Sequence, residues 1–152
     1  MYRKMLVPLD TSEFAECVLV HVKEMATAYS IPEVVLLTVT EPQYASSEAF
    51  LAEQVLEEAD KQAVNSAYEY LERMKNSLGP ISSKVTTAVE VGRPANGILD
   101  YIEKSDVDVV ILSSHGRSGP SRWLLGSVAE KLVRNSPVPV FLVPSLACRL
   151  SS

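Results

Sequence analysis

The chain has 152 residues, of which 47% are hydrophobic and 22% are charged, and its formal net charge is −5. This length and composition are typical of one folded globular domain and exclude a disordered chain. The negative charge argues against a nucleic-acid partner, and no apolar run approaches membrane-spanning length. We therefore expect no nucleic acid, no membrane, and a single domain over residues 1–145 with a C-terminal tail over residues 146–152.

The N-terminus enters a strand-like apolar run at once and lacks the long apolar segment of a secretory signal. Cys17 and Cys148 are isolated in the sequence and have neither metal-ligand spacing nor a C-x-x-C motif. We interpret them as reduced thiols, and these features together predict a cytoplasmic location.

Five apolar runs predict strands at residues 4–9, 34–39, 85–91, 107–112 and 138–143. Several are nearly continuous Val, Ile and Leu, as expected for strands buried on both faces of a parallel sheet. Apolar residues at helical spacing predict helices between them. These helices follow Thr11-Ser12, run over residues 52–78 and 94–104, and begin near Ser127 and end before Pro137.

Strands and helices therefore alternate strictly, which predicts an α/β fold: a doubly wound, five-stranded parallel sheet with helices on both faces, Rossmann-like. The strand order 3-2-1-4-5 is one of the arrangements that the sequence allows. Ligands of such sheets bind at the carboxyl ends of the strands where the order reverses. This order brings Pro8-Leu9-Asp10 beside the segment from Ser113 to Arg117.

The fourth apolar run breaks into a Gly/Ser loop at Gly116, and Gly126-Ser127 opens the next helix. Glycines allow a ligand to approach the backbone, and the N–H groups and dipole at a helix N-terminus attract an anion. A capping interpretation is also open. Asp10 can cap the first helix, and Ser127 and Glu130 form an S-x-x-E capping box.

Several separated motifs follow one another along the chain: Val7-Pro8-Leu9-Asp10, Thr38-Val39, Val91-Gly92-Arg93-Pro94, Ser113-Ser114-His115-Gly116 and Gly126-Ser127-Val128-Ala129-Glu130. In this order and spacing they resemble the motifs of the universal stress protein family. The ATP-binding branch of that family carries G-x2-G-x9-G-[ST]. Gly116 and Gly126-Ser127 match the last three elements, whereas Ser113 stands at the first glycine. Its Cβ narrows the approach to the ribose and phosphates, and its hydroxyl can hydrogen-bond either group.

The resemblance implies ATP or another adenine nucleotide as the ligand, with Mg or Mn. It places adenine near Pro8, Leu9 and Val39, and Asp10 by the ribose or by a phosphate-bound metal. It implies that Leu112, Ser113, His115, Gly116 and Arg117 surround the ribose-phosphate, and that Gly126, Ser127 and Val128 contact phosphate. His115 has no nucleophile at a recognisable spacing, so we interpret it as a loop residue.

Three functions follow as hypotheses. The first is an ATP-binding regulatory or signalling protein, the second a nucleotide-free interaction module of the same fold, and the third a slow ATPase. No P-loop and no convincing general base is present, so we expect at most weak ATP hydrolysis. The run from Val138 to Val143 is an apolar sheet edge in the order 3-2-1-4-5. An apolar edge invites pairing, and we expect a homodimer through this last strand.

Overall fold

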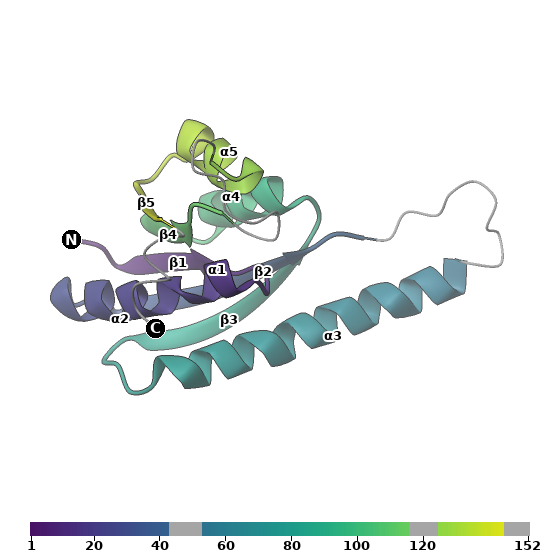
Figure 1. Ribbon diagram of the computed structural model, residues 1–152, viewed down its shortest axis with the longest axis horizontal. Helices are drawn as coiled ribbons and strands as arrows, with labels where there is room; N and C mark the ends of the chain where they lie inside the picture. Colours follow the sequence, from purple (N-terminus) through teal and green to yellow (C-terminus); the bar gives the residue numbers. More distant parts are fainter. Residues whose placement is uncertain (43–52, 116–124, 145–152) are drawn as a thin grey trace.

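The computed structural model describes residues 1–42, 53–115 and 125–144, and Figure 1 shows their arrangement. Strands and helices alternate along them. In chain order they are β1 (Lys4–Pro8), α1 (Glu13–Glu16), α2 (Val18–Ala28), β2 (Glu33–Thr40), α3 (Glu53–Leu78), β3 (Lys84–Val91), α4 (Pro94–Lys104), β4 (Val109–Ser113), α5 (Ser127–Asn135) and β5 (Val140–Val143).

The strands form one parallel sheet in the order β3-β2-β1-β4-β5, which confirms the predicted fold class and strand order. The order reverses between β1 and β4, where Met5 is in register with Val109 and Leu6 with Val110. Every residue of β4 is buried, which explains the continuous apolar sequence of its first four residues. The carboxyl ends of β1 and β4 therefore lie side by side, at the position where doubly wound folds bind ligands.

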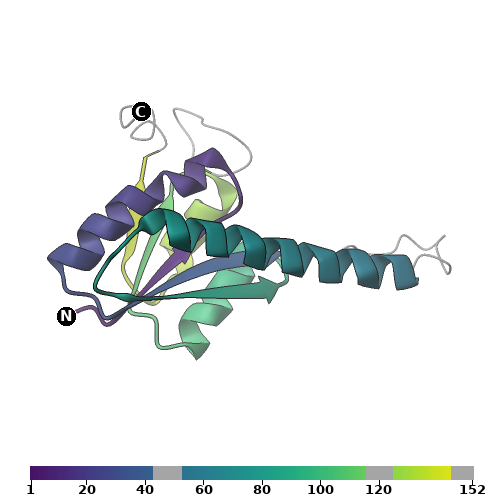
Figure 2. The ribbon, with the colours of Figure 1, turned by 90° about the horizontal axis from the view of Figure 1, so that it is seen from below.

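Helices cover both faces of the sheet (Figures 1 and 2). On one face, α2 and α3 pack on a core that includes Val18, Val22 and Leu71. On the other, α4 and α5 pack on a second core around Ile98, Ile102 and Leu132. Alternate residues of β1 point into the two cores, because successive strand side chains point to opposite faces.

Two predictions for the segment that follows β1 differ from the structure. The helix expected after Thr11-Ser12 is divided into α1 and α2 at Cys17. Cys17 is disulfide-bonded, so its interpretation as an isolated reduced thiol is wrong, whereas Cys148 lies outside the described residues.

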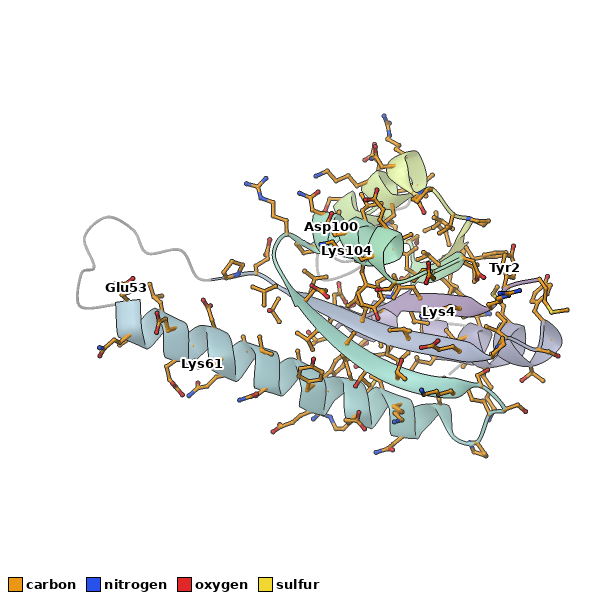
Figure 3. All side chains as sticks on the ribbon, turned by 180° about the vertical axis from the view of Figure 1, so that it is seen from behind. Tyr2, Lys4, Glu53, Lys61, Asp100 and Lys104 are labelled. Atoms are coloured by element: carbon orange, nitrogen blue, oxygen red, sulfur yellow. The ribbon has the colours of Figure 1, made fainter. Side chains whose placement is uncertain are left out.

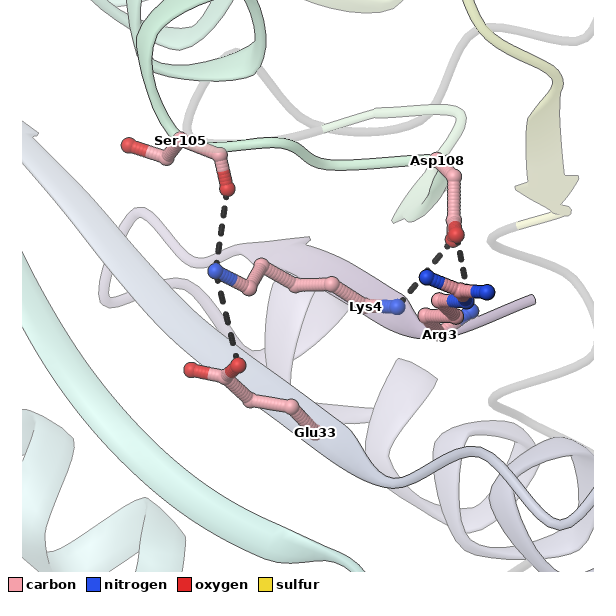
Figure 4. Close-up of polar contacts among 5 residues, drawn as sticks. All are labelled: Arg3, Lys4, Glu33, Ser105 and Asp108. Carbon is pink, nitrogen blue, oxygen red and sulfur yellow. Dashed lines mark hydrogen bonds and ion pairs between the residues drawn. The ribbon is translucent and has the colours of Figure 1, made fainter.

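Polar contacts fasten the amino end of β1 (Figure 4). The Asp108 carboxylate accepts hydrogen bonds from the backbone N–H groups of Arg3, at 2.7 Å, and Lys4, at 3.1 Å. The Lys4 ammonium donates to the Ser105 carbonyl oxygen at 3.0 Å and lies 3.4 Å from the Glu33 carboxylate. These contacts join β1 to both of its neighbours in the sheet, at the end opposite the reversal of strand order.

Helix α3 extends well beyond the sheet (Figure 2). Glu53 and Lys61 lie on its projecting part (Figure 3), and its buried residues begin only at Ala67. Within the described part of the chain, no helix combines the length and the apolar character that crossing a bilayer requires.

Candidate functional site

A cleft of about 870 Å³ lies at the carboxyl ends of the strands. The sequence-predicted site residues that the structure describes all line it. They are Pro8, Leu9, Asp10, Val39, Leu112, Ser113, His115, Gly126, Ser127 and Val128. Gly116 and Arg117 lie outside the described residues. The fold thus brings together residues from β1, β2, β4 and α5 that are up to 120 positions apart in the sequence.

The turn after β1 forms one wall of the cleft. Asp10 Oδ1 accepts hydrogen bonds from the Ser12 hydroxyl, at 2.6 Å, and from the Ser12 backbone N–H, at 3.1 Å. Ser12 is the N-cap of α1, and its hydroxyl oxygen accepts from the backbone N–H of Ala15. Asp10 therefore does not cap α1 itself. It orients the residue that does, while its carboxylate stays at the cleft.

Thr11, between these two residues, has a φ of 70° and is exposed. A β-branched residue in this left-handed region is strained, and such strain is typical of functional turns. The sequence gives no direct signal for it, because a threonine before a serine cap is ordinary. The carbonyl oxygen of Leu9, just before the turn, accepts a hydrogen bond of 2.9 Å from the buried Thr38 hydroxyl. The strained turn thus begins from a point fixed against β2.

The loop after β4 is held by its own serines. The Ser113 hydroxyl is buried and donates to the carbonyl oxygen of His115 at 2.8 Å. The Ser114 hydroxyl lies 3.0 Å from His115 Nδ1, and the Ser114 backbone donates to Val143 and accepts from Gly126. The last two bonds attach the loop to β5 and to the start of α5. Ser113 therefore shapes the loop. His115 contacts both serines of the same loop, which agrees with its interpretation as a loop residue.

Helix α5 begins at the cleft with Gly126 as its N-cap and Ser127 as its first helical residue. The predicted Ser127–Glu130 capping box is therefore wrong, and Glu130 instead forms an ion pair of 3.0 Å with Arg134. No side chain caps this helix end among the described residues. Gly126 has φ −60° and ψ 153°, which any residue can adopt, so its backbone does not require glycine. The lack of a side chain leaves the helix N-terminus open to a ligand.

Val39, on the other side of the cleft, packs tightly against α4. A Cβ added at Gly97 would lie 2.9 Å from Val39 Cγ1 and 3.0 Å from Cγ2. Glycine at position 97 is therefore required by the close approach of α4 to β2. Gly97 was not among the sequence-predicted residues, because a glycine inside a helical pattern indicates no particular contact.

Residues of α3 complete the cleft and were also missed. Ser66, Ala67, Tyr70 and Arg73 line it from one face of the helix, and Glu16 joins them from α1. Arg73 lies over the Tyr70 ring, with its guanidinium carbon 6.0 Å from the ring centroid. Helical spacing places Tyr70 on the apolar stripe of α3, so the sequence alone marks it as a core residue. Arg93 occupies the N-cap position of α4 and is not among the residues that line the cleft.

The Tyr70 side chain is 5% exposed, and its hydroxyl forms no complete hydrogen bond with the described residues. Burial raises the pKa of this phenol well above its ordinary value, and the negative charges of Glu16 and Asp10 raise the pKa further. The backbone of Thr11 acts in the opposite direction. Tyr70 is therefore a neutral donor at physiological pH, enclosed beside the Asp10 turn.

The described residues contain no cluster of three or more His, Cys, Asp or Glu side chains that could hold a metal ion.

Comparison with known proteins identifies the family. The profile of the universal stress protein family matches residues 1–144. The universal stress protein MJ0577 of Methanocaldococcus jannaschii is 30% identical over 154 residues, which cover 94% of this chain and 95% of that protein. Its solved structure superposes with a TM-score of 0.80 and 35% identity, covering 95% of this chain and 96% of that one. The chain therefore belongs to the universal stress protein family.

Two more distant structures share the fold and hold nucleotides. A universal stress protein from Arabidopsis thaliana with AMP bound superposes with a TM-score of 0.62 and 18% identity, over 93% of this chain and 91% of that one. One from Archaeoglobus fulgidus in complex with dAMP gives 0.56 and 19%, over 93% and 97%.

Proposed function

We propose that this chain binds an adenine nucleotide, ATP or a close relative, in the cleft at the carboxyl ends of β1 and β4. The observation that carries the proposal is the N-terminus of α5, which lies at the cleft and has no side-chain cap. Its N-cap is Gly126, and because the backbone angles there suit any residue, the absence of a side chain is not explained by the fold. Helix N-termini of this kind attract phosphate through free N–H groups and the helix dipole. The nucleotides in the related structures agree with this ligand class.

In this proposal each wall of the cleft has one task. Pro8, Leu9 and Val39 form the apolar part that receives adenine. The Asp10 carboxylate accepts hydrogen bonds from ribose hydroxyls or contacts a phosphate-bound metal. Gly126, Ser127 and Val128 receive the phosphates, and Ser113 and His115 shape the loop beside them, with Gly116 and Arg117 continuing it. Mg²⁺ or Mn²⁺ enters with the nucleotide, and we assign its protein contact to the Asp10 carboxylate, which lines the cleft.

The output of binding in this proposal is regulatory. Efficient phosphoryl transfer needs a positioned base and preorganised charge. Asp10 Oδ1 is already bound to Ser12, and the Tyr70 phenol keeps its proton. We therefore expect slow ATP hydrolysis or none, and phosphate release on the order of 1–10³ s⁻¹ would overturn this part of the proposal.

We further propose a homodimer joined through β5 and a cytoplasmic location. Phe141 on β5 is 37% exposed and its ring packs edge-to-face against Tyr2, which leaves aromatic surface beside the sheet edge. Disulfides are uncommon in the cytosol, so the Cys17 disulfide is the feature against which the proposed location has to be tested. Fractionation of cells with trapping of free thiols tests the location and the oxidation state together.

The direct test is the nucleotide content of the protein. Purified protein is denatured, and the released small molecules are separated by chromatography. Isothermal calorimetry with ATP, AMP and GTP, each with and without Mg²⁺, then ranks the ligands. We expect ATP or AMP to bind more tightly than GTP. Binding of none of the three by a folded protein would overturn the proposal and favour a nucleotide-free interaction module.

A further inference from the structure

Tyr70 of α3 lies beside the Asp10 turn although it is sixty residues away in the sequence. Its ring belongs to the same buried core as Leu9 and Ala15, which flank the turn. Its hydroxyl is fully enclosed and completes no hydrogen bond with the described residues. Buried hydroxyls are almost always bonded, so an orphan of this kind needs an explanation.

The groups that act most strongly on the hydroxyl belong to the turn or to the helix that follows it, while Arg73 of α3 lies over the ring. The carboxylates of Glu16 and Asp10 act on it as negative charges, and the backbone of Thr11 acts with the opposite sign. An effect of that sign is what a backbone N–H facing the phenol oxygen produces. The Glu16 side chain and the Thr11 backbone thus lie close enough to act on the hydroxyl as hydrogen-bond partners, although neither contact has the geometry of a complete hydrogen bond.

The turn itself is strained at Thr11, where φ is 70°. A strained β-branched residue persists only where its surroundings impose the conformation, and such residues occur in segments that move or respond to a ligand. A small displacement of the turn toward α3 would complete the hydrogen bonds of the Tyr70 hydroxyl. The carboxylate of Asp10 would move with the turn, because Asp10 and Ser12 are joined by two hydrogen bonds.

We propose that Tyr70 is a positioning residue for Asp10, and that its hydroxyl bonds to the turn when a ligand contacts the Asp10 carboxylate. This inference rests on the proposed nucleotide binding. Tyr70 lines the cleft, but its enclosed hydroxyl acts through the turn and not through a bond to the ligand. It stabilises the position of the turn in which Asp10 meets the ligand, and it couples that position to α3.

The test is the replacement Tyr70→Phe, which removes only the hydroxyl. Tyr68→Phe is the matched control, since Tyr68 lies on the same helix, is 42% exposed and does not line the cleft. Thermal unfolding without added nucleotide reports the contribution of the hydroxyl to the fold. Calorimetry with ATP and Mg²⁺ reports its contribution to binding.

We expect Tyr70→Phe to unfold at the wild-type temperature or slightly above it, and to bind ATP about five- to tenfold more weakly, as the loss of one hydrogen bond predicts. Tyr68→Phe should match the wild type in both measurements. In a double-mutant cycle, Tyr70→Phe should have little further effect in an Asp10→Asn background, because Tyr70 acts through the position of Asp10.

Three results would count against the inference. Equal affinity of Tyr70→Phe and wild type would overturn it and leave nucleotide binding intact. A clear loss of stability or of folding in Tyr70→Phe without nucleotide would show that the hydroxyl is an ordinary structural group. Absence of ATP binding by the wild type would overturn the proposed function, and this inference with it.

Discussion

The hydroxyl of Ser113 donates a hydrogen bond of 2.8 Å to the carbonyl oxygen of His115, two residues further along the loop. The donor of the hydroxyl is therefore committed to the protein. This residue stands where the ATP-binding branch of the family has a glycine, so its effect on binding is a matter of loop shape and space.

Replacing Ser113 by Gly removes this bond, and we expect a loss of about 1 kcal/mol in the free energy of unfolding. We also expect Ser113→Gly to bind ATP at least as tightly as the wild type, because the Cβ no longer narrows the approach. Ser113→Val should bind more weakly. Urea denaturation and calorimetry measure the two effects. Unchanged stability with weaker binding in Ser113→Gly would instead assign the hydroxyl to the ligand.

Gly126→Val tests the phosphate end of the cleft. The backbone of Gly126 is compatible with a side chain, so the variant should fold, whereas a branched side chain would block the open N-terminus of α5. We expect ATP affinity to fall by about tenfold or more, equivalent to about 1.4 kcal/mol. Gly126→Ala should give a smaller loss, and circular dichroism checks the fold. Wild-type affinity in Gly126→Val would place the phosphates elsewhere.

Gly97→Ala tests the contact between α4 and the proposed adenine pocket. The new Cβ would lie 2.9 Å from Val39 Cγ1, and the β-branched valine has little freedom to move away. Overpacking of this kind costs about 1–3 kcal/mol of stability, measurable by thermal or urea unfolding. The double variant Gly97→Ala with Val39→Ala should recover part of that loss. A fully stable Gly97→Ala protein would contradict the tight packing.

Leu142→Pro tests the proposed dimer edge. The carbonyl oxygens of Pro139 and Val143 accept hydrogen bonds from Val110 of β4 and from Ser114, which follows β4, and backbone groups alternate along a strand. The N–H of Leu142 therefore points away from β4, toward the free edge. We expect Leu142→Pro to sediment as a monomer, because proline removes an edge donor, while Leu142→Ala stays a dimer. A wild-type protein that is monomeric at micromolar concentration would refute this interface.

Alkaline pH should destabilise the protein through Tyr70. The pKa of this phenol is raised above its unfolded value of 10.0, so the folded state holds the proton more tightly. Below pH 10 the phenol is protonated in both the folded and the unfolded state, and Tyr70 does not make stability depend on pH. Above pH 10 the unfolded state loses the proton first, so the free energy of unfolding falls as the pH rises, by at most about 1.4 kcal/mol per pH unit. Urea unfolding between pH 9 and 11 measures it, and Tyr70→Phe should show a shallower decline than wild type.

Much of this architecture is predictable because its signals are repeated. Continuous apolar runs mark the buried parallel strands, and Gly79 and Pro94 mark helix boundaries. The predicted start of the last helix near Ser127 is confirmed, whereas the Ser127–Glu130 capping box is wrong, because Gly126 and Ser127 both suit an N-cap and only the three-dimensional structure decides between neighbours. Tyr70 was missed for a different reason. Periodicity assigns a residue to a helix face but does not indicate where a terminal hydroxyl points.

The two ends of β1 differ in how they are held. At the amino end, the Asp108 carboxylate accepts two backbone N–H groups and Lys4 reaches across to Ser105 and Glu33. At the carboxyl end, the chain passes from the Thr38–Leu9 hydrogen bond into a strained turn. The sheet edge at the amino end of β1 is thus fixed by side-chain contacts, whereas the edge at its carboxyl end leads into a strained turn. Substitutions at the amino end should lower the free energy of unfolding, whereas substitutions at the carboxyl end can change the ligand of a relative without changing the strand order.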